Sequence, residues 1–226
     1  GTTTMGVAVA VSQHTTNKNI NVEVKDGTFA AADGGKAFLE VDTVEDETSP
    51  SGNVTIALAG GNFTAPVESK NKTEFVSGGT FTEVLDSTYL GENVNMYVSE
   101  GKYTAATAEN APENAKLVVA VIGTKGYTSL NAAIADVKVG AASQFSEETT
   151  VITLMTDTKD SSDIGTSNGQ APKNVTIDLN GHTLTLGPGV GSAGTETAGL
   201  RVLAYSTLTV KNSTLKCSDD TADHIW

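Results

Sequence analysis

The 226-residue sequence is poor in several residue types, and each shortage excludes a class of protein. Cys217 is the only cysteine, so no disulfide can form within the chain; a lone thiol fits a reducing compartment or a secreted bacterial protein without disulfides. Arg201 is the only arginine and the formal net charge is −13, which argues against binding to nucleic acid phosphates. No apolar run reaches the length of about 18 residues that a membrane-spanning helix needs, so we expect no membrane insertion.

The first residues lack the marks of a targeting segment. Gly1 is followed by three threonines, with neither a charged n-region nor an apolar h-region. We interpret this start as an expression boundary and expect an extracellular or cell-surface bacterial protein whose signal peptide is absent here.

The apolar content of 38% lies below the usual globular range, while Gly, Thr, Asn and Ser are abundant. Val, Ile and Thr dominate the alternating stretches, which favours many short strands joined by turns.

A short pattern occurs four times in the first half: alternating β-branched residues, a glycine turn, and an aromatic two residues later. The glycines stand at positions 27, 61, 79 and 101, with gaps of 34, 18 and 22 residues. The last two gaps are close to one coil of a parallel β-helix, and the first fits a coil with a loop inserted at Glu45 to Gly52. We therefore predict that the aromatics stack from coil to coil, and that these strand residues point inward: Val54, Ile56, Leu58, Val175, Ile177, Leu179, Leu208 and Val210.

An antiparallel sandwich is the alternative, because it also uses short strands and glycine turns. Two-residue hairpin signals are sparse, however, and Asp26-Gly27 and Asn180-Gly181 are the best of them. The predicted fold class is therefore all-β, a right-handed parallel β-helix with one short capping α-helix near residues 129–137.

The organisation of the chain changes near its middle. Residues 105–115 are low in complexity and read as a linker or long loop, followed by a strand from Leu117 to Ile122. A helix is predicted from Ser129 to Val137, capped by Thr128 or Ser129, with an apolar face of Leu130, Ala133, Ile134 and Val137. Residues 53–64 (NVTIALAGGNFT) align with residues 174–185 (NVTIDLNGHTLT), so both halves repeat a coil.

The second half resembles the opening of β-helix modules from large bacterial surface and adhesin-like proteins of the pectate-lyase-like group. The resemblance lies in residues 119–123, 126–135, 151–154, 175–184 and 208–213, and with the first half it covers most of Gly52 to Lys216. It implies that the helix seals the first coil. It also implies that residues 1–115 are the tail of one module, and 116–226 the capping strand, helix and opening coils of a second.

No convincing catalytic constellation is visible. His182 and Asp178 are the most tempting pair, but the resemblance makes them part of a strand-and-turn signature. A lyase would need Arg201 or a lysine as its base, with a ladder of acidic residues that is missing. The acidic pairs Glu147-Glu148 and Asp219-Asp220 lie in polar stretches and read as solvated loops, unlike the paired carboxylates of a glycosidase.

The metal and cofactor signals are weak. Asp157, Asp160 and Asp163 are a weak calcium candidate, because they lack the alternate-position ligands and central glycine of an EF-hand loop. The stretch Gly187 to Gly199 lacks the Gly-Lys-Ser/Thr ending of a phosphate loop. Three further residues are too scattered for a zinc signature: His14, His224 and Cys217. We expect no cofactor.

Three hypotheses follow: a non-catalytic surface module (spacer or adhesin-like), a carbohydrate-active or glycan-binding β-helix, and a trimeric fibre segment. The expected partners are glycans or other cell-surface ligands, and the binding residues are unknown. Open β-helix ends also predict self-association. The coil of Leu208 and Val210 would stack beside that of Val7, Val9 and Val11, within one chain or head to tail, burying Ile225 and Trp226.

Overall fold

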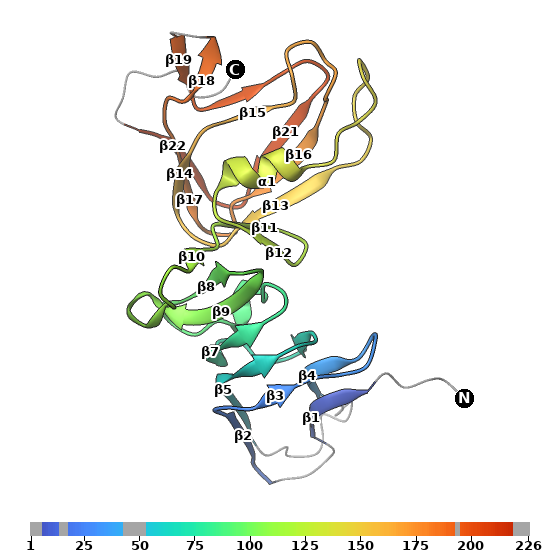
Figure 1. Cartoon of the computed structure of the whole chain (residues 1–226), viewed down its shortest axis with the longest axis vertical. Coiled ribbons are helices and arrows are strands. Elements are labelled where there is room, and N and C mark those ends of the chain that lie inside the picture. Colours follow the sequence, from blue (N-terminus) through green and yellow to red (C-terminus); the bar gives the residue numbers. More distant parts are fainter. Residues whose placement is uncertain (1–5, 14–17, 43–52, 193–194, 219–226) are drawn as a thin grey trace, which may run out of the picture. The chain divides into compact units, whose positions relative to one another are not determined.

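The computed structural model describes residues 6–13, 18–42, 53–192 and 195–218 (Figure 1). The chain divides into two compact units, Gly1–Leu117 and Val118–Trp226. Each is built from short strands stacked as turns of a β-solenoid, about six turns in all, and the described residues hold one short α-helix. The predicted all-β solenoid with a single capping helix is confirmed. None of the helices in these ranges is long and apolar enough to cross a membrane.

The first unit stacks its strands as two parallel ladders, β1-β4-β6 and β2-β5-β7, with β3 paired to the end of β5. Its strands are β1 (Val7–Gln13), β2 (Ile20–Val24), β3 (Thr28–Phe29), β4 (Lys36–Asp42), β5 (Val54–Phe63), β6 (Val67–Ser69), β7 (Val76–Phe81), β8 (Val94–Ser99), β9 (Lys102–Thr107) and β10 (Lys116–Leu117). Two 3-10 helices accompany them, η1 (Ser87–Tyr89) and η2 (Ala108–Asn110).

The register confirms the coil lengths that the glycine spacing predicts. Ile20 lies opposite Val54, which is a turn of 34 residues, and Phe63 lies opposite Phe81, a turn of 18. The ring centroids of Phe29 and Phe63 are 5.0 Å apart, as are those of Phe63 and Phe81. The predicted stacking of aromatics from coil to coil is thus confirmed for these three rings.

The fourth copy of the pattern is not a coil, and that prediction is wrong. β8 and β9 form an antiparallel hairpin through Glu100 and Gly101, whose φ angles are +51° and +76°. The Glu100–Gly101 turn joins two antiparallel strands as a hairpin, whereas Gly61 and Gly79 lie in strands that pair parallel with each other. β9 then pairs antiparallel with β7, which sets Tyr103 opposite Phe81. Residues 105–107, assigned to a linker, are the end of this strand.

The second unit is a three-sided coil of parallel ladders, β13-β16-β21, β14-β17-β22 and β15-β20, with β11 antiparallel on β13. Its elements are β11 (Ala120–Ile122), β12 (Lys125–Tyr127), α1 (Leu130–Asp136), β13 (Thr150–Leu154), β14 (Thr158–Asp160), β15 (Ser162–Ile164), β16 (Asn174–Asp178), β17 (Thr183–Leu186), β18 (Val190–Ser192), β19 (Thr195–Ala198), β20 (Leu200–Val202), β21 (Thr207–Lys211) and β22 (Thr214–Cys217). The strand predicted from Leu117 to Ile122 is interrupted, because β10 ends at Leu117 in the first unit.

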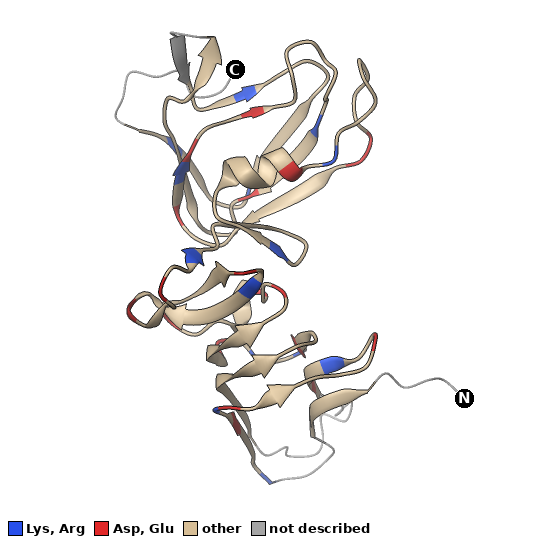
Figure 2. Cartoon of the chain, in the orientation of Figure 1, with Lys and Arg blue, Asp and Glu red and all other residues tan. Residues whose placement is uncertain are grey.

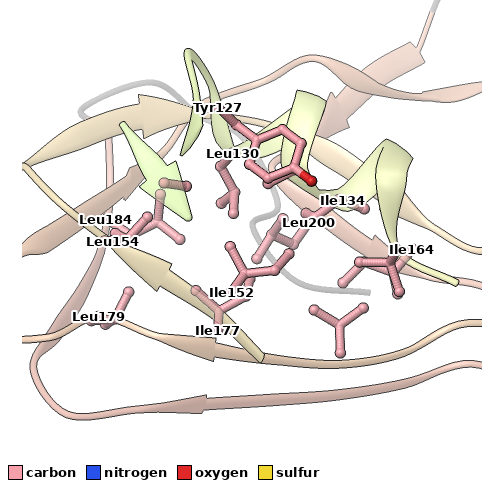
Figure 3. Packing of buried hydrophobic residues seen from close by; sticks show 14 of the residues in the cluster. Tyr127, Leu130, Ile134, Ile152, Leu154, Ile164, Ile177, Leu179, Leu184 and Leu200 are labelled. Atoms are coloured by element: carbon pink, nitrogen blue, oxygen red, sulfur yellow. The ribbon is translucent and has the colours of Figure 1, made fainter. Parts of the chain in front are cut away.

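The predicted helix is present as α1, capped as expected. The Ser129 hydroxyl accepts a hydrogen bond from the Ala132 amide at 3.0 Å. Leu130 and Ile134 are buried in the core of the unit, where Ile152 and Leu154 take the inward positions of β13 (Figure 3). Val151, which precedes Ile152, occupies an outward position of β13 and is exposed.

The inward residues predicted for the solenoid core differ in burial. Most are buried, whereas one at the start of β5 and two on β21, the last strand of its ladder, are half-buried, and Thr55 is exposed. The buried ones are Ile56, Leu58, Val175, Ile177 and Leu179, and the half-buried ones are Val54, Leu208 and Val210. The predicted burial of Ile225 and Trp226 concerns residues outside the described ranges.

Candidate binding surface

The residues first considered for catalysis lie apart. His182 Nδ1 is 3.6 Å from Asp157 Oδ1, and that oxygen accepts the Thr183 amide at 2.8 Å. Asp178 instead faces β21: it accepts the Asn212 side-chain amide at 3.0 Å and lies 3.1 Å from Lys211 Nζ. Partial burial acts to raise the pKa of Asp178, but these hydrogen bonds outweigh it and the pKa is lowered. The carboxylate therefore pins two neighbouring turns together.

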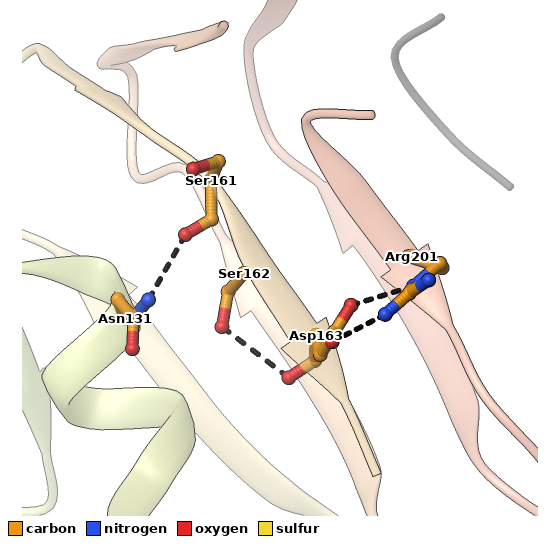
Figure 4. Close-up of polar contacts among 5 residues, drawn as sticks. All are labelled: Asn131, Ser161, Ser162, Asp163 and Arg201. Atoms are coloured by element: carbon orange, nitrogen blue, oxygen red, sulfur yellow. Dashed lines mark hydrogen bonds and ion pairs between the residues drawn. The ribbon is translucent and has the colours of Figure 1, made fainter. Parts of the chain in front are cut away.

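The three aspartates of the calcium candidate are not brought together. Asp160 accepts the Asn131 amide at 3.0 Å, so it lies at the first turn of α1 and supplements the Ser129 cap. Asp163 holds Arg201 by two bonds of 2.8 and 2.7 Å across the β15-β20 ladder (Figure 4). This pairing raises the pKa of the guanidinium. Within the described ranges, no three His, Cys, Asp or Glu side chains lie close enough to share a metal ion.

The other candidates are exposed or lie outside the described ranges. Glu148 forms an exposed ion pair with Lys138, and Glu147 beside it is also exposed. Cys217 is an exposed free thiol at the end of β22. In Figure 2 the acidic residues are spread over both units rather than gathered on one strand face. Four candidates fall outside the described residues: His14, Asp219, Asp220 and His224.

A buried carboxylate that the sequence reasoning missed lies in the first unit. Glu40 on β4 is 3% exposed and accepts hydrogen bonds from the Ser69 hydroxyl at 2.7 Å and from the Lys70 and Asn71 amides at 3.1 and 3.0 Å. Burial acts to raise the pKa of Glu40, but the hydrogen bonds outweigh it and the pKa is lowered. The charge closes the corner after β6, which is a structural role.

A buried lysine, equally missed, fastens the helix to the coil. Lys173 Nζ donates to the carbonyls of Ile134 and Ala135 at 2.6 and 3.1 Å, at the C-terminal end of α1. A cation there satisfies carbonyls that have no partner within the helix. Burial lowers the pKa of Lys173, while the negative charge of Asp136 acts to raise it. Both ends of α1 are therefore secured by side chains from the solenoid.

The surface that structural roles leave unexplained is aromatic. Phe145 is 67% exposed and Tyr205 is 42% exposed, although they come from loops 60 residues apart. Their ring centroids are 5.8 Å apart and the ring planes meet at 73°, an edge-to-face pair. Exposed large apolar side chains gathered in one place are typical of interaction sites. We call this pair, with Val139, the aromatic surface.

A groove adjoins the aromatic surface. It has a volume of about 470 Å³ and is lined by residues 138–141 and 144–148, so Phe145 and Val139 form part of its wall. The carboxylates of Glu147 and Glu148 also line it, as do the side-chain amide of Gln144 and the hydroxyl of Ser146. The groove is thus mainly polar, and Phe145 and Val139 are the large apolar side chains in its wall.

Hydrogen bonds from neighbouring turns hold the loop that carries the groove. The Ser143 amide donates to the Gly169 carbonyl at 2.7 Å, and the Asn174 side-chain amide donates to the Ser146 carbonyl at 3.1 Å. Gly140 donates to the Pro172 carbonyl at 2.9 Å. The aromatic surface is therefore presented on an anchored frame.

The backbone at Tyr205 is held in a conformation that disfavours an aromatic residue. Its φ is +58°, a left-handed value that costs about 1–2 kcal/mol for a residue with a Cβ. Its ring lies against Gly169, where an added Cβ would meet ring carbon Cδ2 at 2.8 Å.

Comparison with known proteins adds no relative: no family model matches the chain, and no curated protein or solved structure matches it significantly.

The sequence contains one signal that points to the aromatic surface. Phe145 is an isolated aromatic inside the polar run from Ser143 to Glu148, where no strand or helix period explains it. The sequence around Tyr205 gives no such signal, because its pairing with Phe145 depends on two loops that are far apart in sequence.

Proposed function

We propose that this chain is a non-catalytic, adhesin-like module of an extracellular or cell-surface protein, in which a β-solenoid carries a sugar-binding surface. The observation that carries the proposal is the exposed Phe145–Tyr205 pair beside a polar groove on an anchored loop. The resemblance of the sequence pattern to pectate-lyase-like surface modules, together with the solenoid fold, supports the proposal of a cell-surface module.

The chemistry of the surface favours a neutral sugar. The C–H faces of a pyranose ring pack on exposed aromatic rings, while its hydroxyls bond to amide and carboxylate groups of the kind that line the groove. Glu147 and Glu148 line it too, and the whole chain has a net charge of −13, so a uronate would be repelled.

The absence of catalysis is proposed from the use of the titratable groups. Asp178, Asp163 and Asp160 each bridge neighbouring elements of the solenoid, and Arg201 is held by Asp163. A lyase needs a base free to abstract a proton, and a glycosidase needs two carboxylates facing one substrate. These side chains hold turns together instead.

Binding of neutral oligosaccharides to the purified chain, first on an array and then by calorimetry, tests the proposal. Phe145→Ala and Tyr205→Ala should each weaken binding by about tenfold or more, which is about 1.4 kcal/mol. Tyr205→Phe keeps the ring and should retain binding, and Val151→Ala serves as an exposed apolar control on β13. Equal affinity of all four variants would exclude the aromatic surface as the binding site.

A second assay separates binding from catalysis. The purified chain should release no unsaturated uronide from polygalacturonate or alginate, with or without calcium, and should not shorten the oligosaccharides that it binds. Product formation abolished by His182→Ala or Asp178→Ala would contradict the non-catalytic proposal.

A further inference from the structure

The groove beside the aromatic surface holds a negative charge without a partner. Among the described residues that line it, Lys138 is the one basic residue, and it forms an ion pair with Glu148. Glu147 also lines the groove, and within the described ranges its carboxylate forms no hydrogen bond or ion pair. An unpaired charge at a binding site favours a ligand of the opposite charge, because complementary charges select partners.

The unpaired carboxylate and the exposed ring come from the same short segment. Phe145 and Glu147 are exposed, whereas Ser146 between them is half-buried. Both exposed residues line the groove. A ligand that packs on the Phe145 ring from the groove therefore meets the Glu147 carboxylate in the same space.

Contacts at Ser146 fix the backbone of this segment. Its carbonyl accepts the Asn174 side-chain amide at 3.1 Å, and its hydroxyl donates to the Glu148 carbonyl at 3.3 Å. The other arm of the loop lies against it, since a Cβ added at Gly140 would meet Ser146 Cβ at 2.8 Å. The backbone that carries the ring and the carboxylate is thus held in place before a ligand binds, which reduces the entropy lost on binding.

The ring and the carboxylate together distinguish three kinds of sugar. Each kind can place a C–H face on an aromatic ring. A uronate brings a negative charge and is repelled, and a neutral sugar brings only uncharged polar groups. A sugar with an ammonium group forms a charge-assisted hydrogen bond to a carboxylate, and a cation is also attracted to the face of an aromatic ring.

From the unpaired Glu147 beside Phe145 we propose that the groove selects a sugar carrying a free ammonium group over a neutral sugar of the same shape. This inference rests on the proposed sugar-binding function and names its preferred ligand class. A neutral sugar still binds through the rings, but more weakly. The net charge of −13 on the whole chain acts in the same direction at longer range.

Calorimetry with the glucosamine trimer and with cellotriose tests the preference, in a slightly acidic buffer that protonates the sugar amines. The two trimers share their linkage and differ in one substituent of each ring, which is an ammonium group in the first and a hydroxyl in the second. The glucosamine trimer should bind about fivefold more tightly, which corresponds to the attraction of two unit charges about 4 Å apart in water. The preference should shrink at about 1 M salt, where the Debye length is about 3 Å.

Two glutamate variants separate the groove from the general charge of the chain. Glu147→Gln removes the unpaired carboxylate and should bring the two trimers to equal affinity. Glu113→Gln makes the same change of formal charge at an exposed residue of the first unit, and it should leave the preference intact. Both glutamates are exposed, so neither change should impair folding, which circular dichroism checks.

The outcomes distinguish this inference from the proposed function. If the unmodified chain bound cellotriose as tightly as the glucosamine trimer, or if Glu147→Gln kept the preference, the ligand class would be wrong while sugar binding stood. An equal loss of preference in Glu113→Gln would assign it to the net charge and overturn the role of the groove. Failure to bind any sugar would overturn the proposed function, and this inference with it.

Discussion

The two units form the same kind of coil from different side chains. The first is built around stacked rings, Phe29, Phe63 and Phe81, with centroids 5.0 Å apart. The second is built around Ile, Leu and Val, and among the described residues of its core cluster Tyr127 is the one aromatic ring. The difference extends to the ends, because a capping helix packs on the core of the second unit, while a hairpin closes the β5-β7 ladder of the first.

The comparison indicates what a solenoid turn requires. Neither aromatic stacking nor aliphatic packing is essential, but inward alternation and a left-handed residue at the corner recur in both units. In the first unit that residue is a glycine such as Gly61 or Gly79, and in the second it is Asn180 or Asn212. Function is then free to differ between units, and the aromatic surface lies on the second alone.

The largest effect is expected where the ring ladder is cut. Phe63→Ala removes the middle ring, which is fully buried, and should destabilise the first unit by about 3–5 kcal/mol. Hydrogen exchange measured by mass spectrometry should be faster than in the unmodified chain for residues 20–81 and unchanged for residues 150–186. Equal loss in both units would mean that they unfold as one cooperative body.

The matching change in the second unit is Ile134→Ala, on the buried face of α1. It should cost about 2–5 kcal/mol, because the helix covers Ile152 and Leu154. Denaturation followed by circular dichroism measures the loss, and Ala135→Ser on the exposed face is the control. A loss below about 0.5 kcal/mol would show that the helix is a loose appendage.

Glu40 makes the stability of the first unit depend on acid, as Asp178 does in the second. Its folded pKa is lowered, so its contribution is present above the unfolded value of about 4.3 and is lost as pH falls through the folded pKa. Glu40→Gln leaves backbone donors facing an amide and should cost about 1–3 kcal/mol at neutral pH. The variant should also lose less further stability on acidification than the unmodified chain, in denaturation curves at neutral and acidic pH. If the variant lost as much stability on acidification as the unmodified chain, Glu40 would be excluded as a source of the acid dependence.

Two glycine variants compare the corners. Gly181 has φ +83° with open space around it, so Gly181→Ala should cost only the left-handed penalty of about 1–2 kcal/mol. Gly61→Ala should cost more, because its Cβ would also lie 3.0 Å from Phe29 Cε2. Urea midpoints measure both. Gly181→Asn should be milder than Gly181→Ala, since Asn tolerates this region better.

The sequence predicts the fold better than the site, for a physical reason. Alternation around Val175 and Ile177 and the spacing of Gly61 and Gly79 are local signals, and each dictates which way a side chain or corner faces. Whether the segment after Ser99 turns a corner or reverses is not a local signal: Glu100 and Gly101 have positive φ angles like Asn180 and Gly181, but only the former close a hairpin.

The site residues are harder to predict because their partners are remote in sequence. Glu40 is satisfied by donors about 30 residues away, and Lys173 by carbonyls nearly 40 residues away. The Phe145–Tyr205 pair is set by the stacking of turns, so neither ring reveals the other. To predict that these two rings meet, the length of every coil between Phe145 and Tyr205 would have to be predicted correctly.

The smallest effect on stability is expected at the aromatic surface, where a ring exposed in the second unit can be compared with a ring buried in the first. Phe145→Ala removes a ring that is 67% exposed and should change the free energy of unfolding by no more than about 0.5 kcal/mol, while Phe63→Ala removes a ring of equal size from the interior. Thermal unfolding of both variants, beside sugar binding by the same samples, separates the roles. If Phe145→Ala destabilised the second unit as strongly as a core change, the ring would be part of the packing that holds the loop. A stable variant that has lost binding leaves ligand contact as the reason for an exposed ring.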